Sequence, residues 1–189
     1  MIGRAELAVI ILAGGEARRM GGGKPLRFLA GRTLLDRAIE RATSWSDRVL
    51  IAARTPEQVT RVALPVVVDP PGVAGPLAGL ASARRISRAL VLTIPCDMPF
   101  LPDDLPSRLA AGLSGSAAAL AASGGRVHPV CGLWRSEALV HLDPYLATGQ
   151  QSVLGFAETI GYAAVQGEPD EFANVNTPED LAWAEARLA

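Results

Sequence analysis

The sequence has few cysteines, no marked excess of either charge and no long hydrophobic run. Its two cysteines, Cys96 and Cys131, lie 35 positions apart without a CxxC spacing, so they indicate neither a disulfide framework nor a zinc site. The formal net charge is −1, so the field on which nucleic-acid binders rely is missing. The apolar run at residues 7–12 is too short for a signal-peptide core or a membrane span. These absences predict a cytoplasmic protein that binds small molecules or proteins, with no nucleic-acid or membrane partner.

Apolar stretches rich in β-branched residues recur along the first two thirds of the chain. Such runs, bounded by glycine, proline or charged residues, are typical of strands that are covered on both faces of a parallel sheet. Five of them predict strands at residues 8–12, 48–53, 65–69, 89–94 and 117–122.

Helical patterns separate these strands. Residues 33–45 place apolar side chains opposite charged ones, which predicts an amphipathic helix with Thr33 as its N-cap. Residues 76–86 begin with Pro76 and predict a second crossover helix. The alternation predicts an α/β fold with a doubly wound, mostly parallel sheet and helices on both faces. Ligands bind at the carboxyl ends of the strands in such sheets.

The pattern loosens after about residue 125. We expect a strand at residues 127–134, a short helix at 136–147 that is broken at Pro144, and a closing helix at 177–189 capped by Thr177. No linker or repeat divides the chain, so residues 1–189 are predicted to form a single domain.

A glycine-rich loop at residues 12–25 follows the first predicted strand. Its backbone N–H groups can wrap around an anion such as phosphate, and Arg18, Arg19 and Lys24 supply positive charge. The alternative is a flexible surface loop with solvated basic side chains. Pro25 after the lysine breaks the Walker A pattern, and no GxGxxG fingerprint follows the strand.

The pattern LAGGxxxRMGxxK at residues 12–24 resembles the nucleotide-sugar type of nucleotidyltransferases, and most closely the molybdenum cofactor guanylyltransferase family. Four further blocks resemble that family in its order: VVVDPPGVAGPLAGL, PCDMPFL, RVHPVCGLW and FANVNTPEDL. The resemblance implies a Rossmann-like nucleotidyltransferase domain with a nucleotide-binding half at about 7–110 and a pterin-substrate half at about 111–189. It also implies transfer of GMP from GTP to molybdopterin, with release of pyrophosphate and assistance from Mg²⁺.

The resemblance assigns nucleotide contacts to the glycine loop and to two later segments. Arg19 and Lys24 would neutralise charge as the α-phosphate is attacked. Asp69 would contact the guanosine, although it can equally be a turn carboxylate before two prolines. The residues expected to bind the nucleotide through the backbone are Leu12, Ala13, Gly14 and Gly15 in the loop, and Gly75, Pro76 and Leu77. The second group can instead serve only close helix packing.

Asp97 follows the predicted strand at residues 89–94 and is the candidate ligand for Mg²⁺, which prefers one or two carboxylates together with substrate oxygens. The alternative is a turn or cap residue. Together with Arg19 and Lys24 it forms the predicted catalytic set. The attacking phosphate is already an anion, so no general base is nominated.

The pterin substrate needs hydrogen bonds opposite the nucleotide. Asn174 and Asn176 can donate to and accept from a ring edge, or they can merely shape the turn before the last helix. His128 is a further candidate for this substrate, and a structural histidine is its alternative. Chaperones or target reductases that receive the product are the expected protein partners.

Two positions depart from the family pattern. Ala17 replaces a small polar residue, and Gly23 replaces the aspartate before the lysine, which leaves Lys24 less fixed. Residues 51–58 lack asparagines that family members carry, and Arg54 is the candidate to replace one. Two rival functions stay open: a cytidylyl or sugar-nucleotide transferase of the same fold, and a catalytically weak cofactor carrier.

Overall fold

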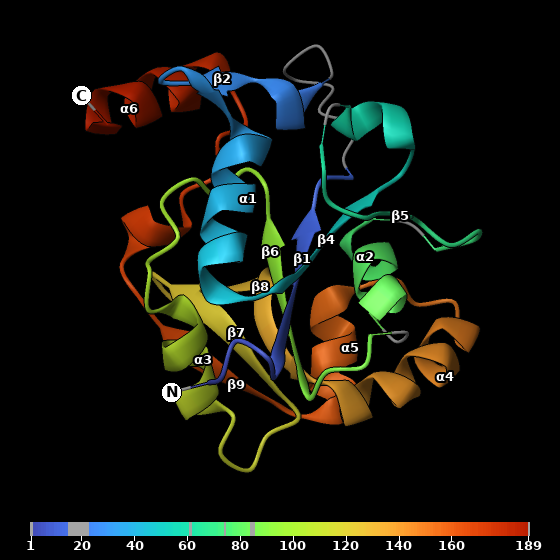
Figure 1. The fold of residues 1–189 in the computed structure, drawn as a ribbon. Helices are drawn as coiled ribbons and strands as arrows, with labels where there is room; N and C mark the ends of the chain where they lie inside the picture. Colours follow the sequence, from blue (N-terminus) through green and yellow to red (C-terminus); the bar gives the residue numbers. More distant parts are fainter. Residues whose placement is uncertain (1, 15–22, 61, 74, 84–85, 189) are drawn as a thin grey trace.

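The computed structural model describes residues 2–14, 23–60, 62–73, 75–83 and 86–188. A seven-stranded sheet lies at its centre, with helices on both sides (Figure 1). The strand order is β5-β4-β1-β6-β8-β7-β9, and only β8 runs antiparallel to its neighbours. The mostly parallel sheet is therefore confirmed. The seven strands have these bounds: β1 Leu7–Leu12, β4 Arg48–Ala53, β5 Val66–Val68, β6 Leu90–Pro95, β7 Ala118–Ser123, β8 Arg126–Arg135 and β9 Tyr162–Gln166.

Helices cover both faces of this sheet, as the sequence predicts. Helices α1 (Leu34–Trp45) and α3 (Leu105–Gly112) pack on one face, against side chains such as Val9 and Ile51. Helices α2 (Pro76–Ser82), α4 (Leu142–Ala147) and α5 (Val153–Ile160) pack on the other, where the core includes Ile10. Alternate residues of the central strands thus enter two separate apolar layers.

The later part of the chain differs from the sequence prediction. The predicted break at Pro144 is wrong, because a 3-10 turn at Ser136–His141 leads into α4, and Pro144 lies in the first turn of that helix. A first-turn N–H has no partner within the helix, so proline is tolerated there. Helix α2 ends at Ser82, short of the predicted end at residue 86. Helices α3 and α5 and strand β9 had no counterpart in the sequence prediction.

The chain reverses direction across the sheet between β1 and β6. It builds β1, β4 and β5 outward and then returns to place β6 on the other side of β1. Such a reversal opens a crevice at the carboxyl ends of the two central strands, which is where ligands bind in this architecture. Leu12 pairs with Pro95 at that edge, so the glycine loop and the segment after β6 leave the sheet side by side.

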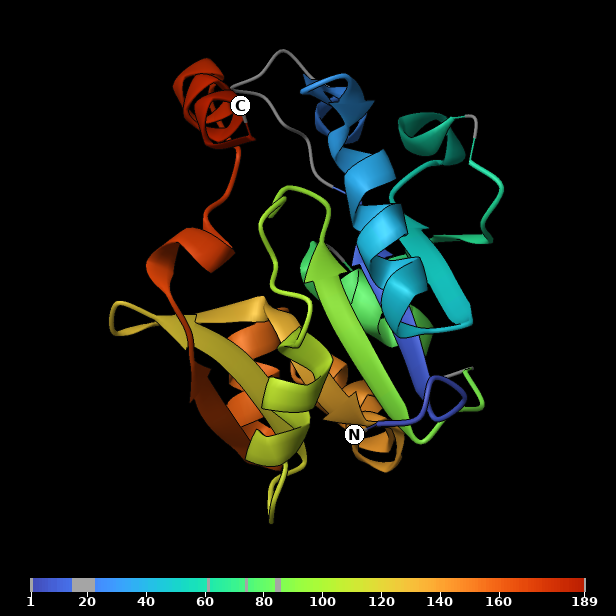
Figure 2. The same cartoon turned by 60° about the vertical axis from the view of Figure 1, so that its left-hand side comes forward.

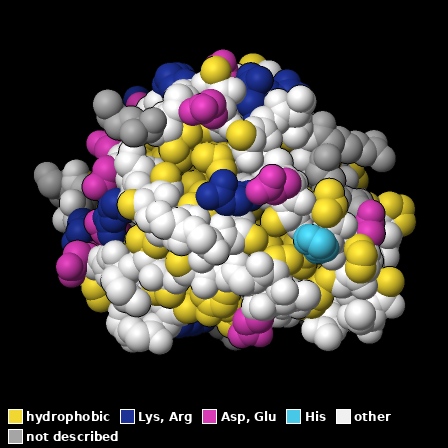
Figure 3. Space-filling view, turned by 90° about the horizontal axis from the view of Figure 1, so that it is seen from below, with side chains coloured by type: hydrophobic (Ala, Val, Ile, Leu, Met, Phe, Trp, Pro, Cys, Tyr) yellow, Lys and Arg dark blue, Asp and Glu magenta, His cyan; other side chains and the backbone are white. Residues whose placement is uncertain are grey.

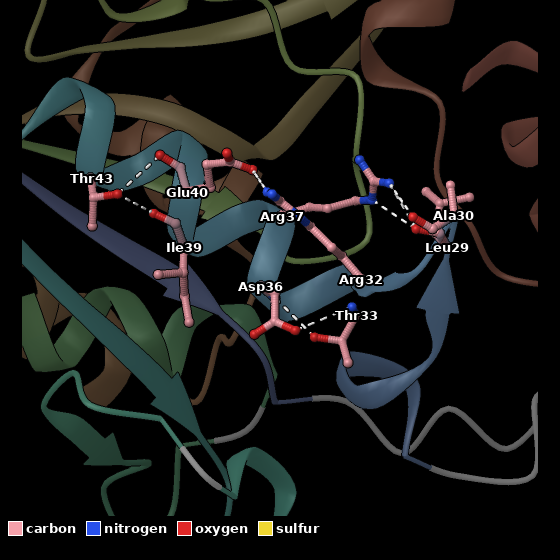
Figure 4. A network of polar contacts seen from close by, with 9 residues as sticks. All are labelled: Leu29, Ala30, Arg32, Thr33, Asp36, Arg37, Ile39, Glu40 and Thr43. Carbon is pink, nitrogen blue, oxygen red and sulfur yellow. Dashed lines mark hydrogen bonds and ion pairs between the residues drawn. The ribbon is translucent and has the colours of Figure 1, made fainter. Parts of the chain in front are cut away.

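The segment after Lys24 is anchored on α1 (Figure 4). Thr33 accepts from the Asp36 N–H and Asp36 accepts from the Thr33 N–H, which confirms the predicted cap and forms a capping box. Arg37 donates to the Leu29 carbonyl from two nitrogens, at 3.0 and 2.8 Å. This ties the hairpin of β2 (Phe28–Leu29) and β3 (Arg32–Thr33) to α1.

The closing helix α6 (Pro178–Leu188) lies beside β2, apart from the layers that flank the sheet (Figure 2). It buries Ala184 in a small cluster with Leu29, Leu34 and Val175. None of the helices in the described ranges is long and apolar enough to cross a membrane.

Candidate active site

A cavity of about 330 Å³ opens at the crevice between the carboxyl ends of β1 and β6. Leu12, Ala13 and Gly14 form one wall, and Asp97 stands on the β6 side. Lys24, Pro76, Asn174 and Asn176 complete its polar and backbone lining, together with Pro25, Pro95, Cys96 and Val130. Residues from six separate stretches of the chain therefore meet at the predicted ligand edge.

Two larger hollows, of about 650 and 720 Å³, lie at the end of the sheet where the parallel strands begin (Figure 3). The first is lined by residues of α4 and α5 such as Tyr145 and Ile160, and the second by residues such as Glu6 and Ala110. Neither contains a residue that the sequence singled out for chemistry. The charged and amide groups converge instead in the smaller cavity, at Lys24, Asp97 and Asn176.

Lys24 connects three segments of the chain at the cavity. Its Nζ donates to Asp97 Oδ2 and, at 2.5 Å, to Asn176 Oδ1. The Lys24 and Asp97 side chains are 14% and 19% exposed, so the pair is only partly reached by solvent. An ammonium has three donors, and these interactions use two of them. The arrangement can present the remaining donor to an anion in the cavity.

Backbone hydrogen bonds hold Asp97 in place. The Cys96 N–H donates to the Leu12 carbonyl at 3.2 Å, which continues the pairing of β1 with β6 by one residue. The Asp97 carbonyl accepts from the Val175 N–H at 2.9 Å. Asp97 is thus a turn residue in its backbone, while its carboxylate faces Lys24. The backbone thus fits the turn residue that the sequence allowed, and the role of the carboxylate as an Mg²⁺ ligand stays a prediction.

Asp69 lies behind the glycine loop at the end of β5. A Cβ at Gly14 would stand 3.5 Å from Asp69 Oδ2 and 3.3 Å from the Arg54 nitrogen, so the missing side chain permits this close approach. Burial raises the pKa of Asp69, and the positive charge of Arg54 opposes that shift. The structure places Asp69 beside the loop, next to the cavity wall rather than in its lining.

The three residues of the predicted nucleotide-binding segment at Gly75 to Leu77 lie in different surroundings. Pro76 lines the cavity, and Gly75 precedes α2 with a φ of 69°, a conformation that favours glycine. The side chain of Leu77 is fully buried in the core. The close packing of this helix on the sheet, which was the alternative for this segment, is present too, because a Cβ at Gly79 would overlap the side chain of Leu12.

The two asparagines and His128 lie in different surroundings. Asn174 and Asn176 line the cavity, whereas His128 does not. Instead His128 stacks on Phe172 with ring centroids 5.2 Å apart, and its Nε2 is 2.8 Å from the Ser123 hydroxyl. Burial lowers the pKa of His128, and the charge of Arg126 lowers it further. A role of His128 toward the pterin substrate would therefore be indirect.

Two predicted residues, Gly15 and Arg19, lie outside the described residues, as does Arg18. The sequence missed Val130, which reaches the cavity because β8 bulges opposite Leu120 and Ala121. Bulges commonly re-aim side chains next to active sites. Cys96 also lines the cavity, and burial raises the pKa of its thiol to about 12, so it is no nucleophile.

The described residues contain no cluster of three His, Cys, Asp or Glu side chains that could hold a metal ion by themselves. A single carboxylate at a phosphate site nevertheless fits Mg²⁺, which keeps several waters and takes its other ligands from substrate oxygens. Asp97 is the carboxylate in the cavity lining and has the chemistry for this.

The doubly wound sheet and the lysine–carboxylate pair beside a glycine loop define a nucleotidyltransferase. The model of the MobA-like NTP transferase domain matches residues 9–160. A molybdenum cofactor guanylyltransferase of Cereibacter sphaeroides is 45% identical over 95% of both chains, and one of Acidiphilium cryptum is 42% identical over 96% and 95%. The chain belongs to the molybdenum cofactor guanylyltransferase family, and it is an enzyme of the nucleotidyltransferase class.

Solved structures share the fold. Molybdopterin-guanine dinucleotide biosynthesis protein A from Archaeoglobus fulgidus superposes with a TM-score of 0.79 at 22% identity, over 96% of this chain and 98% of that one. A 2-C-methyl-D-erythritol 4-phosphate cytidylyltransferase from Thermus thermophilus gives 0.71 at 22% identity, over 95% and 97%. A protein of molybdopterin-guanine dinucleotide biosynthesis and a cytidylyltransferase therefore share this fold, and the architecture by itself leaves the nucleobase open.

Proposed function

We propose that this enzyme transfers GMP from GTP to the terminal phosphate of molybdopterin in the cytoplasm. A phosphate oxygen of molybdopterin forms a bond to the α-phosphorus of GTP, the bond from that phosphorus to the α–β bridging oxygen breaks, and pyrophosphate leaves. The observation that supports it is the ammonium of Lys24 between Asp97 and Asn176, at the switch point of a chain whose relatives are named guanylyltransferases.

The residues of the cavity suit this chemistry without a general base. The nucleophilic phosphate is already anionic, so catalysis rests on positioning and on neutralising charge. Lys24 holds its ammonium toward the triphosphate, and backbone groups of Leu12 to Gly14 contact the nucleotide. Asp97 would hold Mg²⁺, which supplies neutralisation of phosphate charge when bound. We assign Arg19 to the same phosphates from the sequence pattern.

The two parts of the chain divide the substrates in this proposal. Lys24, Asp69 and Asp97 belong to the nucleotide-binding half at about 7–110, with Gly15, Gly75 and Leu77 contributing backbone. Asn174 and Asn176 come from the half at about 111–189 and would face molybdopterin, whereas His128 of the same half lies outside the cavity lining and would act only indirectly. The product would pass to a chaperone or target reductase. Two free buried thiols suit the reducing cytoplasm.

Release of pyrophosphate tests this proposal. The purified enzyme is incubated with Mg²⁺, with or without molybdopterin, and with GTP, CTP or UTP in parallel. We expect release only when GTP and molybdopterin are both present, and loss of release with a chelator. Preference for CTP would support a cytidylyltransferase, and tight binding of GTP without release would support a carrier.

The Asp97→Asn variant tests the metal ligand in the same assay. We expect turnover to fall at least about 100-fold, the size of effect that follows loss of an electrostatic group at a phosphoryl or acyl transfer site. The exposed Glu158→Gln variant on α5 is the matched control and keeps full turnover. Unchanged turnover of Asp97→Asn would show that this carboxylate holds no metal.

A further inference from the structure

We propose that Asp180 is a positioning residue of the active site, acting through Asn176 on Lys24. The inference rests on the proposed function, and it concerns a segment beyond residues 9–160, which the family model matches. Asp180 lies in the first turn of α6 and does not line the cavity. Its effect therefore has to travel through residues that do.

One carboxylate oxygen of Asp180 accepts hydrogen bonds from two backbone N–H groups. Its Oδ2 accepts from the Asn176 N–H at 2.8 Å and from the Thr177 N–H at 2.9 Å. In return, the Asp180 N–H donates to the Thr177 hydroxyl at 3.1 Å. Hydrogen bonds to a carboxylate are about twice as strong as those between neutral groups. The turn that presents Asn176 is thereby tied to the helix that follows it.

One of these bonds exceeds what a helix start requires. A capping box consists of the reciprocal bonds between the N-cap and the third helical residue, here Thr177 and Asp180. The bond from the Asn176 N–H is additional, because Asn176 precedes the cap. It fixes the backbone of the residue whose side-chain oxygen accepts from Lys24.

The neighbouring N–H group points to the same purpose. Val175 donates to the carbonyl of Asp97, the residue whose carboxylate pairs with Lys24. Three successive N–H groups, from residue 175 to residue 177, are thus bound either to Asp97 or to Asp180. Residues 175–177 are thus held by Asp97 on one side and by Asp180 on the other. These bonds are needed because α6 buries only Ala184 among its described side chains and stands apart from the main layers, so its packing holds the turn weakly (Figure 2).

The position of the Asn176 turn affects catalysis because Asn176 helps to orient the Lys24 ammonium. Asn176 is a neutral acceptor that takes one N–H, so the ammonium is shared between an amide and the Asp97 carboxylate. If the Asn176 turn loosens, Lys24 keeps its charge but loses one of the two contacts that aim it. Small misplacements of a charged group affect the transition state more than ground-state binding. We therefore expect kcat to change more than the KM for GTP.

A set of variants separates this role from helix capping. Asp180→Ala removes the bonds of the carboxylate to the N–H groups of Asn176 and Thr177, whereas Thr177→Ala removes only the bond from the Asp180 N–H to the Thr177 hydroxyl. We expect kcat to fall about tenfold in Asp180→Ala and less than twofold in Thr177→Ala, with the KM for GTP within twofold of wild type in both. Asp180→Asn, which keeps an acceptor oxygen, should recover part of the loss. The exposed Glu179→Gln variant is the control with unchanged kinetics.

A double-mutant cycle supplies the decisive measurement. In the Asn176→Ala background, Asp180→Ala should reduce kcat by less than twofold further, because the side chain through which it acts is gone. Equal losses in Asp180→Ala and Thr177→Ala, or a full tenfold loss in both backgrounds, would overturn the proposal.

Amide hydrogen exchange tests the same contact without turnover. Exchange at residues 175–177 should accelerate in Asp180→Ala more than in Thr177→Ala, whereas exchange in β1 and β6 should stay unchanged. Unchanged exchange at residue 176 would overturn the proposal. If wild-type enzyme forms no pyrophosphate from GTP, the proposed function fails, and the exchange result still decides whether Asp180 holds the turn.

Discussion

The ammonium of Lys24 pairs with the carboxylate of Asp97 although 73 positions separate them in the chain. Lys24 follows the glycine loop after β1, and Asp97 follows β6, the parallel neighbour of β1. The pair therefore exists because the sheet places β6 next to β1. It brings an ammonium and a carboxylate to one point of the cavity.

We expect Lys24→Gln to lower kcat for pyrophosphate release about 100-fold, because the amide keeps hydrogen-bonding capacity but loses the charge. The loss in a Lys24→Gln, Asp97→Asn double variant should be well below the product of the single losses, since the two groups act as a unit. Steady-state kinetics of the four proteins measure this. Multiplicative losses would show that the pair does not act together.

Asp69→Asn should raise stability and weaken GTP binding. Because burial raises the pKa of Asp69 above its ordinary value of 3.8, the folded state holds the proton more tightly than the unfolded state. Wild type therefore loses stability relative to the variant as the pH rises from 3.8 through the folded pKa. Denaturant unfolding should show equal stability below pH 3.8 and a more stable variant at pH 7. If Asp69→Asn is less stable than wild type at pH 7, the stability prediction is wrong. If it binds GTP with wild-type affinity, the binding prediction is wrong.

Gly23→Asp restores the carboxylate that the family pattern places before the lysine. Gly23 has φ 63° and ψ 24°, so any side chain there should lower the free energy of unfolding by about 1 kcal/mol. Gly23→Ala has a similar backbone penalty and is the matched control. Lys24 is already held by Asp97 and Asn176, so we expect kcat of the two variants to agree within twofold. A tenfold advantage of Gly23→Asp would show that the lost carboxylate limits this enzyme.

Both cysteines should resist alkylation in the native enzyme. Burial raises the pKa of the Cys96 and Cys131 thiols to about 12, so almost no thiolate forms at pH 8. Mass spectrometry after iodoacetamide treatment at pH 8 should find no label on the folded protein and two labels after denaturation. Rapid labelling of Cys96 in the native state would mean that the cavity floor opens to solvent.

The sequence predicted the elements whose signals are local. Strand β4 was predicted with its observed bounds, and Thr33 was predicted as the cap of α1, because period, β-branching and capping are properties of neighbouring residues. The same holds for the ligand edge, since Lys24 and Asp97 both follow buried strands. Local rules failed at Pro144, where a proline in a first helical turn resembles a proline that breaks a helix.

By itself the sequence determined the alternating α/β pattern and the family, and it proposed the residues for nucleotidyl transfer. The tertiary structure decided which of them meet: Asn176 on Lys24, the Val175 N–H on Asp97, and Val130 at the cavity through the bulge in β8. It also places His128 outside the cavity lining, where its ring stacks on Phe172. The reason is physical, because patterns along the chain record which face a side chain takes, while contacts between distant segments depend on strand order and register.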